Sequence, residues 1–238
     1  MNNEPILITG VGKRLGLHLA QNFLIRGIPV IGTYRTQRDS IQELVNMGAK
    51  MYHCDFHDEL EILNFTRSIS QHHQGLRAII HNASEWMSDD HKDLTAAEIM
   101  HSMMQVHVTA PYQINLMLQE LLLQSAHKHT DIIHIGDYIT SRGSTKHIAY
   151  AASKAAQDNL TLSFAARLAP KVKVNSIAPA LVLFKEDDDE SYKEKALNKS
   201  LMQREAGLDE ILHAVDYLMQ SEYVTGRILP VDGGRHLK

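Results

Sequence analysis

Short apolar runs alternate with segments of helical pattern along the whole chain, and this alternation limits the fold more than any other feature. Seven runs read as strands, at residues 5–10, 29–34, 50–56, 76–83, 130–137, 172–179 and 227–232. Helical patterns fill the intervals, at 13–27, 41–48, 59–73, 98–126, 148–170 and 209–220. Strands that are almost entirely apolar are typical of a parallel sheet covered on both faces. The sequence therefore predicts a single α/β domain over residues 1–238, with a Rossmann-type, doubly wound parallel sheet of about seven strands flanked by helices on both faces.

Composition and charge narrow the classes of function. A net charge of −4, with lysines and arginines scattered among acids, leaves no basic stripe for nucleic acid. No long uncharged run occurs, so no membrane span is expected. The beginning, "MNNEPILITG", shows neither a basic leader nor a cleavage site, and Cys54 is the only cysteine, so we expect a cytoplasmic protein without disulfides. The fifteen histidines, including those of "HCDFH", lack the spacing of metal motifs, so no metal is expected.

Residues 181–208 form the one stretch without a clear element pattern. An acidic run from Glu186 to Glu190 precedes a short predicted helix around "SYKEKALNKSLM". The stretch follows the carboxyl end of a strand, which is where ligands bind in sheets of this kind. We expect a substrate-binding lid, and the alternative is a solvated surface insertion.

The segment "TGVGKRLG" lies where a phosphate-binding turn belongs, after the first strand and at the start of the first helix. Gly10 permits a tight turn, and the free amides at the helix start can face a pyrophosphate. The glycines alone are a weak signal, and their position after the first strand strengthens it. The predicted cofactor-binding residues of this turn are Gly10, Lys13, Arg14, Leu15 and Gly16.

The end of the second strand chooses between the two nicotinamide cofactors. An acid there binds the ribose hydroxyls of NAD, whereas this chain has Arg35 and Thr36. A guanidinium and a hydroxyl suit the 2′-phosphate of NADP, and the alternative is an ordinary exposed arginine. Asp55, after the third strand, is a candidate for the adenine amino group. The "NAS" segment after the fourth strand is expected to line the adenosine and nicotinamide side, through Asn82, Ala83 and Ser84.

Tyr150 and Lys154 are one helical turn apart in the segment "YAASK", so they share a face of the predicted helix. A nearby ammonium favours the phenolate and lowers the pKa of a tyrosine, which then serves as a general acid. The alternative is an aromatic side chain in the core with an exposed lysine. The position of the pair after the fifth strand favours the catalytic interpretation.

Four segments together resemble the short-chain dehydrogenase/reductase family: "TGVGKRLG", "NAS", "YAASK" and "YVTGRILPVDGG". The resemblance covers essentially the whole chain. Within the family it is strongest to pteridine reductases and, from "HNASEWM", "HIAYAASKAA", "VKVNSIAP", "NKSLM" and "DGGRH", to the bacterial dihydromonapterin reductases. It implies that NADPH reduces 7,8-dihydromonapterin or a related dihydropterin to the tetrahydro form, with weaker reduction of dihydrofolate. It also implies a homo-oligomer, expected to be a tetramer.

Three residues separate this branch from generic carbonyl reductases: Arg14, Trp86 and Asp137, the last standing at the usual serine position. Trp86 is expected to stack on the flat pterin, or else to anchor a loop. Arg14 is expected near the pyrophosphate and the pterin carbonyl. Asp137 is expected to hold the amine-like edge of the ring and to act with Tyr150 in proton delivery, because reduction of a C=N bond sends a proton to nitrogen. The substrate-binding prediction comprises Arg14, Ser84, Trp86, Asp137 and Tyr150, and the catalytic one Tyr150, Lys154 and Asp137.

Other residues depart from the family pattern. His107 stands where the family has an asparagine of a proton relay, and Phe184 stands where a threonine often binds the nicotinamide amide. The first change leaves open whether a proton relay operates here. The second shifts the expected contact with the nicotinamide amide to Pro179 and the backbone at Val182.

Two rival functions stay open at this stage. One is a carbonyl reductase that acts on a 3-oxoacyl thioester or a sugar ketone, against which Asp137 counts. The other is a non-catalytic NADP-binding regulator, against which the intact Tyr150 and Lys154 count. The sequence does not choose between dihydromonapterin, dihydrobiopterin and dihydrofolate.

Overall fold

The computed structural model describes residues 4–238 and shows one sheet of seven strands, all parallel. The strands lie in the order β3-β2-β1-β4-β5-β6-β7. Their bounds are β1 (Ile6–Ile8), β2 (Val30–Tyr34), β3 (Lys50–His53), β4 (Ala78–His81), β5 (Thr130–Ile135), β6 (Val172–Pro179) and β7 (Arg227–Val231). The predicted doubly wound α/β fold is confirmed. Residues 1–3, which open the segment expected to carry no leader, lie outside the described residues.

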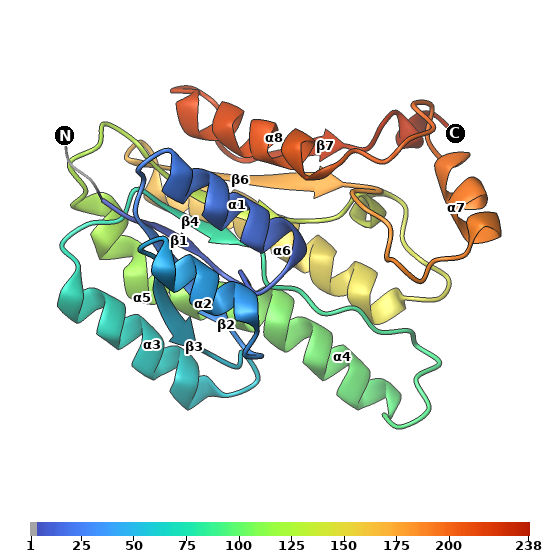
Figure 1. Ribbon diagram of the computed structural model, residues 1–238, viewed down its shortest axis with the longest axis horizontal. Helices are drawn as coiled ribbons and strands as arrows, with labels where there is room; N and C mark the ends of the chain where they lie inside the picture. Colours follow the sequence, from blue (N-terminus) through green and yellow to red (C-terminus); the bar gives the residue numbers. More distant parts are fainter. Residues whose placement is uncertain (1–3) are drawn as a thin grey trace.

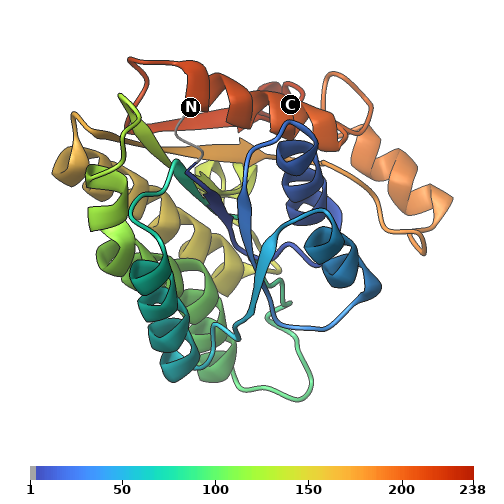
Figure 2. The ribbon, with the colours of Figure 1, turned by 60° about the vertical axis from the view of Figure 1, so that its left-hand side comes forward.

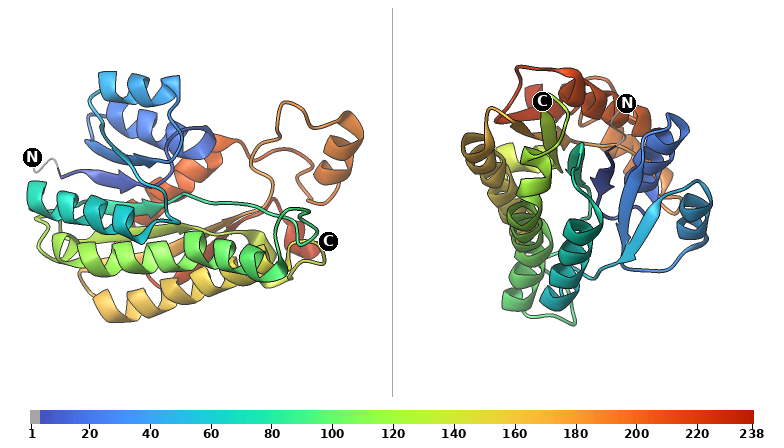
Figure 3. Two further views of the ribbon diagram at one scale, coloured as in Figure 1. Left: turned by 90° about the horizontal axis from the view of Figure 1, so that it is seen from below. Right: turned by 90° about the vertical axis from the view of Figure 1, so that its left-hand side faces the viewer.

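Helices cover both faces of the sheet (Figures 1, 2 and 3). One layer contains α1 (Arg14–Ile25), α2 (Asp39–Asn46) and α8 (Leu208–Gln220). The other contains α3 (Glu59–His72), α5 (Ala110–Leu123) and α6 (Ile148–Leu168), with α4 (Ala96–Met104) packed on α6. Alternate strand residues serve the two layers, since Ile6 and Ile8 pack on the first and Leu7 on the second. Burial on both sides explains why the inner strands β1, β2 and β4 are mostly apolar.

The stretch predicted as one helix over residues 98–126 is interrupted. It begins at a capping box formed by Thr95 and Glu98, runs through α4, and then widens into a π-helical turn at Gln105–Thr109 before α5. Pro111 lies just after the π turn and has no amide proton to donate, so one backbone hydrogen bond is missing from this continuous helical stretch. Residues 96–123 are helical throughout, so hydrophobic periodicity does not reveal the π turn, and the helix ends three residues before the predicted end at 126.

The strand order reverses at β1, which pairs with β2 on one side and β4 on the other. The carboxyl ends of strands at such a reversal border a crevice where ligands bind in doubly wound sheets. Beyond these ends, the chain between β6 and α8 projects from the body and carries the short helix α7 (Glu190–Leu197), as Figures 1 and 3 show. This projection is the segment predicted as a lid.

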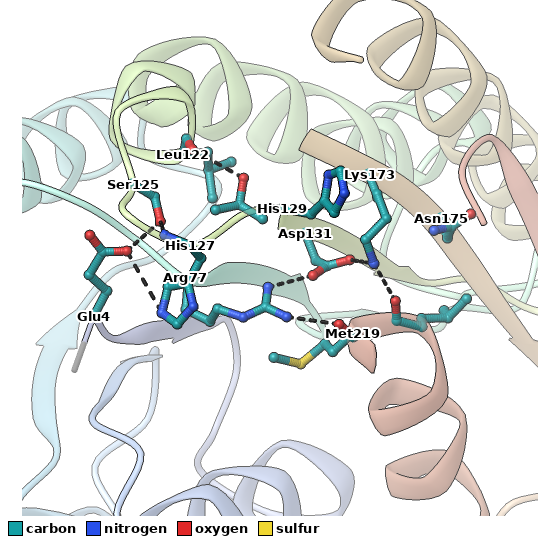
Figure 4. A network of polar contacts seen from close by, with 12 residues as sticks. Glu4, Arg77, Leu122, Ser125, His127, His129, Asp131, Lys173, Asn175 and Met219 are labelled. Atoms are coloured by element: carbon teal, nitrogen blue, oxygen red, sulfur yellow. Dashed lines mark hydrogen bonds and ion pairs between the residues drawn. The ribbon is translucent and has the colours of Figure 1, made fainter. Parts of the chain in front are cut away.

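A buried charge network occupies the opposite, amino-terminal edge of the sheet (Figure 4). The carboxylate of Asp131 lies 2.5 Å from Nη1 of Arg77 and 2.7 Å from Nζ of Lys173. Arg77 also donates to the carbonyl of Met219 at 2.9 Å, and Lys173 donates to that of Leu218 at 2.5 Å, so both cations reach the last turn of α8. Burial raises the pKa of Asp131, and the two cations oppose that rise. The network joins the starts of three strands to one helix.

Candidate active site

A cavity of about 310 Å³ lies at the carboxyl ends of β1, β2 and β4. Its lining includes all the predicted cofactor residues of the phosphate turn and of the three following strand ends: Gly10, Lys13, Arg14, Leu15, Gly16, Arg35, Thr36, Asp55, Asn82, Ala83 and Ser84. Lys154, Pro179 and Val182 are not among its lining residues. The carbonyl of Val182 accepts a hydrogen bond from the amide of Gly207 at 2.9 Å, which fixes the base of the lid.

The phosphate turn is built for a close backbone approach. Gly10 has a φ of +72°, and a Cβ there would lie 2.9 Å from Cα of Ala83. A Cβ at Gly16 would overlap the carbonyl oxygen of Gly10 and the amide of Asn82. That amide donates to the carbonyls of Thr9 and Gly10, each at 3.0 Å. Asn82 therefore braces the turn through its side chain, a role that sequence reasoning missed.

Arg14 joins the turn to the lid. It begins α1 with a φ of +51°, a left-handed conformation that favours glycine. Its Nη2 donates to the carbonyl oxygen of Leu183 at 2.5 Å. The side chain predicted to reach substrate thus contacts the backbone of the segment over the site.

Arg35 forms an ion pair across the cavity with Glu85, a residue that sequence reasoning did not select. The other carboxylate oxygen of Glu85 lies 3.1 Å from Nε2 of His57 and accepts from the hydroxyl of Ser102 at 3.0 Å. Burial raises the pKa of Glu85, but the hydrogen bonds from Arg35 and His57 outweigh it and leave that pKa lowered. The Glu85 side chain is only 13% exposed. Its loop position follows no sequence pattern, so no signal marks it in advance.

Tyr150 and Asp137 form the central pair of the site. The Tyr150 hydroxyl donates to Oδ2 of Asp137 at 2.7 Å, while Oδ1 accepts from the amide of Ile139 at 2.7 Å. Burial raises the pKa of Tyr150, and the carboxylate of Asp137 raises it further. The expectation that this pKa is lowered is wrong for the protein alone, because the hydroxyl faces an acid in a buried place.

Lys154 lies under Tyr150 inside the fold, with 2% of its surface exposed. Its Nζ donates to the carbonyl of Ile135 at 2.8 Å and lies 6.0 Å from the centre of the Tyr150 ring. Burial lowers the pKa of Lys154 to about 8, although the negative charges of Asp137 and Asp158 oppose that shift. The alternative of an exposed lysine beside a core aromatic is therefore excluded.

His107 connects the loop after β4 to α6. Its Nε2 lies 2.8 Å from the hydroxyl of Ser84 and accepts from the amide of Glu85 at 3.2 Å. Its Nδ1 lies 2.8 Å from the hydroxyl of Ser153, which in turn donates to the backbone carbonyl of Tyr150 at 2.8 Å. The ring of His107 also stands edge-on to that of Tyr150, with centres 5.5 Å apart.

Trp86 does not line the cavity, and 59% of its surface is exposed. Its ring is tilted against that of His147, with centres 4.2 Å apart. On the lid side, Nζ of Lys185 lies 5.7 Å from the indole. The lid base is closed by the amide of Ala206, which donates to the carbonyl of Leu181 at 3.1 Å. Trp86 is thus placed between the lid and the loop that precedes α6.

Two other histidines are part of the interior. The rings of His81 and His134 stack at 5.0 Å, and they reach Asn115 and Thr161, each at 2.8 Å. Burial lowers the pKa of His81 to about 4.

Residues 4–238 contain no group of three or more His, Cys, Asp or Glu side chains able to hold a metal ion. In the same part of the chain, no helix has both the length and the apolarity to cross a membrane.

Comparison with known proteins gives concordant results. A family model described as enoyl-(acyl carrier protein) reductase matches residues 10–236. Dihydromonapterin reductase of Klebsiella pneumoniae subsp. pneumoniae is 53% identical, with 99% of this chain and 98% of that protein covered. Dihydromonapterin reductase of Escherichia coli K12 is 51% identical, with 98% and 97% covered.

Solved structures show the same fold. The crystal structure of FolM alternative dihydrofolate reductase 1 from Brucella suis, in complex with NADP, superposes with a TM-score of 0.87 at 24% identity, covering 99% of this chain and 96% of that one. The sequence matches extend over the turn, the loop after β4, the Tyr150 helix and the end of the chain. The chain belongs to the short-chain dehydrogenase/reductase family, within the group of the dihydromonapterin reductases.

Proposed function

We propose that the protein uses NADPH to reduce 7,8-dihydromonapterin, or a closely related dihydropterin, to its tetrahydro form. The observation that carries the proposal is the hydrogen bond from the Tyr150 hydroxyl to Asp137 beside the buried Lys154. A carboxylate at this place suits a substrate edge that presents N–H groups, whereas a ketone needs a donor to its oxygen. The names of the relatives that are 51–53% identical support the same substrate class.

The cavity suits a dinucleotide with an added phosphate. The turn leaves no room for a Cβ at Gly10 or Gly16, and Arg35 and Thr36 lie where the ribose of adenosine is expected. Bound NADPH supplies the hydride. Arg35 would hold the 2′-phosphate in competition with the carboxylate of Glu85, and Asp55 would accept a hydrogen bond from the adenine amino group.

In this scheme the chain's own groups position the substrate and handle one proton. Asp137 accepts hydrogen bonds from the amine-like edge of the pterin, while Trp86 covers the ring plane and Ser84 borders it. Hydride reaches a ring carbon of the C=N bond and a proton reaches its nitrogen, and Tyr150 with Asp137 delivers that proton. Lys154 would hold the cofactor ribose, and it keeps a positive charge beneath Tyr150. Residues 181–208 close over the substrate as a lid.

A substrate panel tests the proposal. Oxidation of NADPH is followed with dihydromonapterin, dihydrobiopterin, dihydrofolate and a 3-oxoacyl thioester, and kcat/KM is compared. We expect dihydromonapterin to rank first and dihydrofolate to be weaker. A higher kcat/KM for the thioester would support the rival carbonyl reductase. Cofactor binding without turnover of any substrate would support a regulator.

We also propose that the protein works in the cytoplasm as a homo-oligomer, a tetramer by family resemblance. Light scattering of the purified protein measures its mass against the 26.8 kDa of one chain. A mass of one chain at working concentrations contradicts the oligomer.

A further inference from the structure

His107 joins three parts of the site from a fully buried position. It is 0% exposed and lies in the π-helical turn between α4 and α5. That turn is fixed to the body by the side-chain amide of Gln105, which donates to the carbonyl of Phe56 at 2.8 Å. The ring therefore projects from a rigid and unusual stretch of backbone, and π turns of this kind are frequent at functional sites.

The hydrogen bonds of His107 define one tautomer. The amide of Glu85 is a donor, so Nε2 must be an acceptor, and the neutral ring then carries its proton on Nδ1. That proton points to the hydroxyl of Ser153, whose own hydrogen goes to the carbonyl of Tyr150. The Ser84 hydroxyl donates to the same Nε2. Every polar atom of the imidazole is thus engaged within the protein.

Nε2 of His107 holds Ser84 and Glu85, and Trp86 follows them directly in the chain; the three residues face different parts of the site. Ser84 lines the cofactor cavity, and Glu85 reaches across that cavity to Arg35. Trp86 turns to the other side, between His147 and Lys185. A shift of this short segment would therefore move the adenosine side and the pterin side together.

Proton transport through this ring requires both nitrogens to be protonated in turn. A proton on Nε2 would face the amide hydrogen of Glu85, so that bond would break. The chain through Ser153 also ends at the backbone carbonyl of Tyr150 and not at its hydroxyl. In addition, burial and the charge of Lys154 together lower the pKa of His107 to about 2.

We propose that His107 is a positioning residue that clamps the segment 84–86 to α6 at a fixed distance from Tyr150, and that it carries no proton in turnover. The proposal deepens the function stated above, since it assigns the placement of Ser84 and Trp86 to a ring that lies behind them. At the position where the family has an asparagine of a proton relay, His107 therefore acts by holding the neighbouring segment in place and not by passing protons.

Two substitutions test the roles of the two ring nitrogens of His107 separately. The amide nitrogen of His107→Asn takes the place of Nδ1 and keeps the bond to Ser153, but it leaves Ser84 and Glu85 without their acceptor. The amide oxygen of His107→Gln takes the place of Nε2 and keeps that acceptor. Trp86 is the only tryptophan, so intrinsic fluorescence reports the position of the segment directly, without substrate. His134→Asn is a matched control, because His134 is equally buried but bonds to Thr161.

We expect His107→Asn to shift the Trp86 emission and to raise KM for dihydromonapterin roughly fivefold or more, as the loss of one or two hydrogen bonds predicts. The pH profile of kcat should keep its shape. His107→Gln should stay nearer to wild type in emission and KM, and His134→Asn should lower thermal stability with unchanged emission.

Three results would overturn the proposal. Loss of one limb of the pH profile in both His107 variants, with unchanged emission, would make His107 a proton carrier. Unchanged emission and KM in His107→Asn would show that the segment needs no clamp. An equal emission shift in His134→Asn would assign the effect to general loosening. If the wild type fails to reduce any dihydropterin, the emission spectra and NADPH titrations still decide whether the clamp exists, so the two failures are distinguishable.

Discussion

Asp137 is the single residue on which the substrate class depends most. Its carboxylate accepts from the Tyr150 hydroxyl and raises the pKa of that tyrosine. Asp137→Asn keeps an oxygen for the amide of Ile139 but removes the charge. We expect turnover of dihydromonapterin to fall by ~10²–10⁴, the usual contribution of a general acid–base group. The pKa of Tyr150 should fall as well, so any alkaline limb due to Tyr150 moves to lower pH in a kcat–pH profile. Unchanged turnover of dihydromonapterin would show that the Asp137 carboxylate takes no part in the reaction.

In the proposed complex, Glu85 would compete with the cofactor for Arg35. The two side chains form an ion pair in the cavity, so the carboxylate would oppose the approach of a 2′-phosphate to the guanidinium. We expect Glu85→Gln to lower the Kd for NADPH about fivefold, as the loss of a partly exposed ion pair implies. Affinity for NADH, which lacks that phosphate, should change little. Fluorescence titration of both cofactors measures this, with the exposed Glu59→Gln as control. Weaker NADPH binding would mean that Glu85 orients Arg35 instead.

At the scale of elements, the amino-terminal edge of the sheet offers a test of stability alone. Asp131 is buried between Arg77 and Lys173, and its removal leaves two cations without their counter-charge. We expect Asp131→Asn to lower the free energy of unfolding by roughly 3–5 kcal/mol, as for other broken buried ion pairs. Urea unfolding measures the change, and kcat of the folded fraction should be unaffected.

Glu222→Gln is the control for that experiment. Glu222 pairs with Lys128 on the surface, where both side chains are largely exposed. Water screens such a pair, so the urea midpoint should not move measurably. Equal destabilisation by the two substitutions would show that burial does not set the value of the Asp131 network.

Elements also mark the limit of prediction from sequence. All seven strands and the predicted helices follow from apolar periodicity, and α7 overlaps the first part of the helix expected around residues 191–202, beginning one residue earlier and ending five residues sooner. The π turn does not follow from apolar periodicity, because a helical turn that holds one extra residue contains the same types of residue as an ordinary turn. It places His107 toward Ser84 and Ser153, so the clamp depends on a feature that no pattern of residue types reveals.

For the whole molecule, Lys154 links stability to pH. Its pKa in the folded protein is lowered to about 8 by burial, against an ordinary value of 10.5. Between those values the unfolded chain holds a proton that the folded protein has released, so this group makes stability rise with pH there. Below about pH 8 both states are protonated and the unfavourable burial of the ammonium is fully present.

We therefore expect the stability of Lys154→Met relative to wild type to be greatest below about pH 8 and to decline as the pH approaches 10.5. Thermal unfolding of both proteins from pH 7 to 10 measures the difference. A difference that does not vary with pH would show that the folded-state pKa is not lowered.

The sequence predicts which strand ends meet, because parallel strands place all their carboxyl ends at one edge. That rule brought the turn at Gly10, the Arg35 strand end and the Ser84 loop to one cavity. It does not choose partners within the cavity. The pairing of Arg35 with Glu85, and of Lys154 with the carbonyl of Ile135, depends on side-chain reach between elements far apart in the chain.

The network around Asp131 and the pair formed by Tyr150 and Asp137 lie at opposite edges of the sheet. Residues that contribute to thermal stability are therefore separated in space from residues that determine the reaction. A library that varies the Asp131 rim can be screened for survival at high temperature without disturbing catalysis. A second library of substitutions around Trp86 can then be screened on the stabilised protein for reduction of other heterocycles. Because the two regions are far apart, the effects of the two sets of substitutions should be additive.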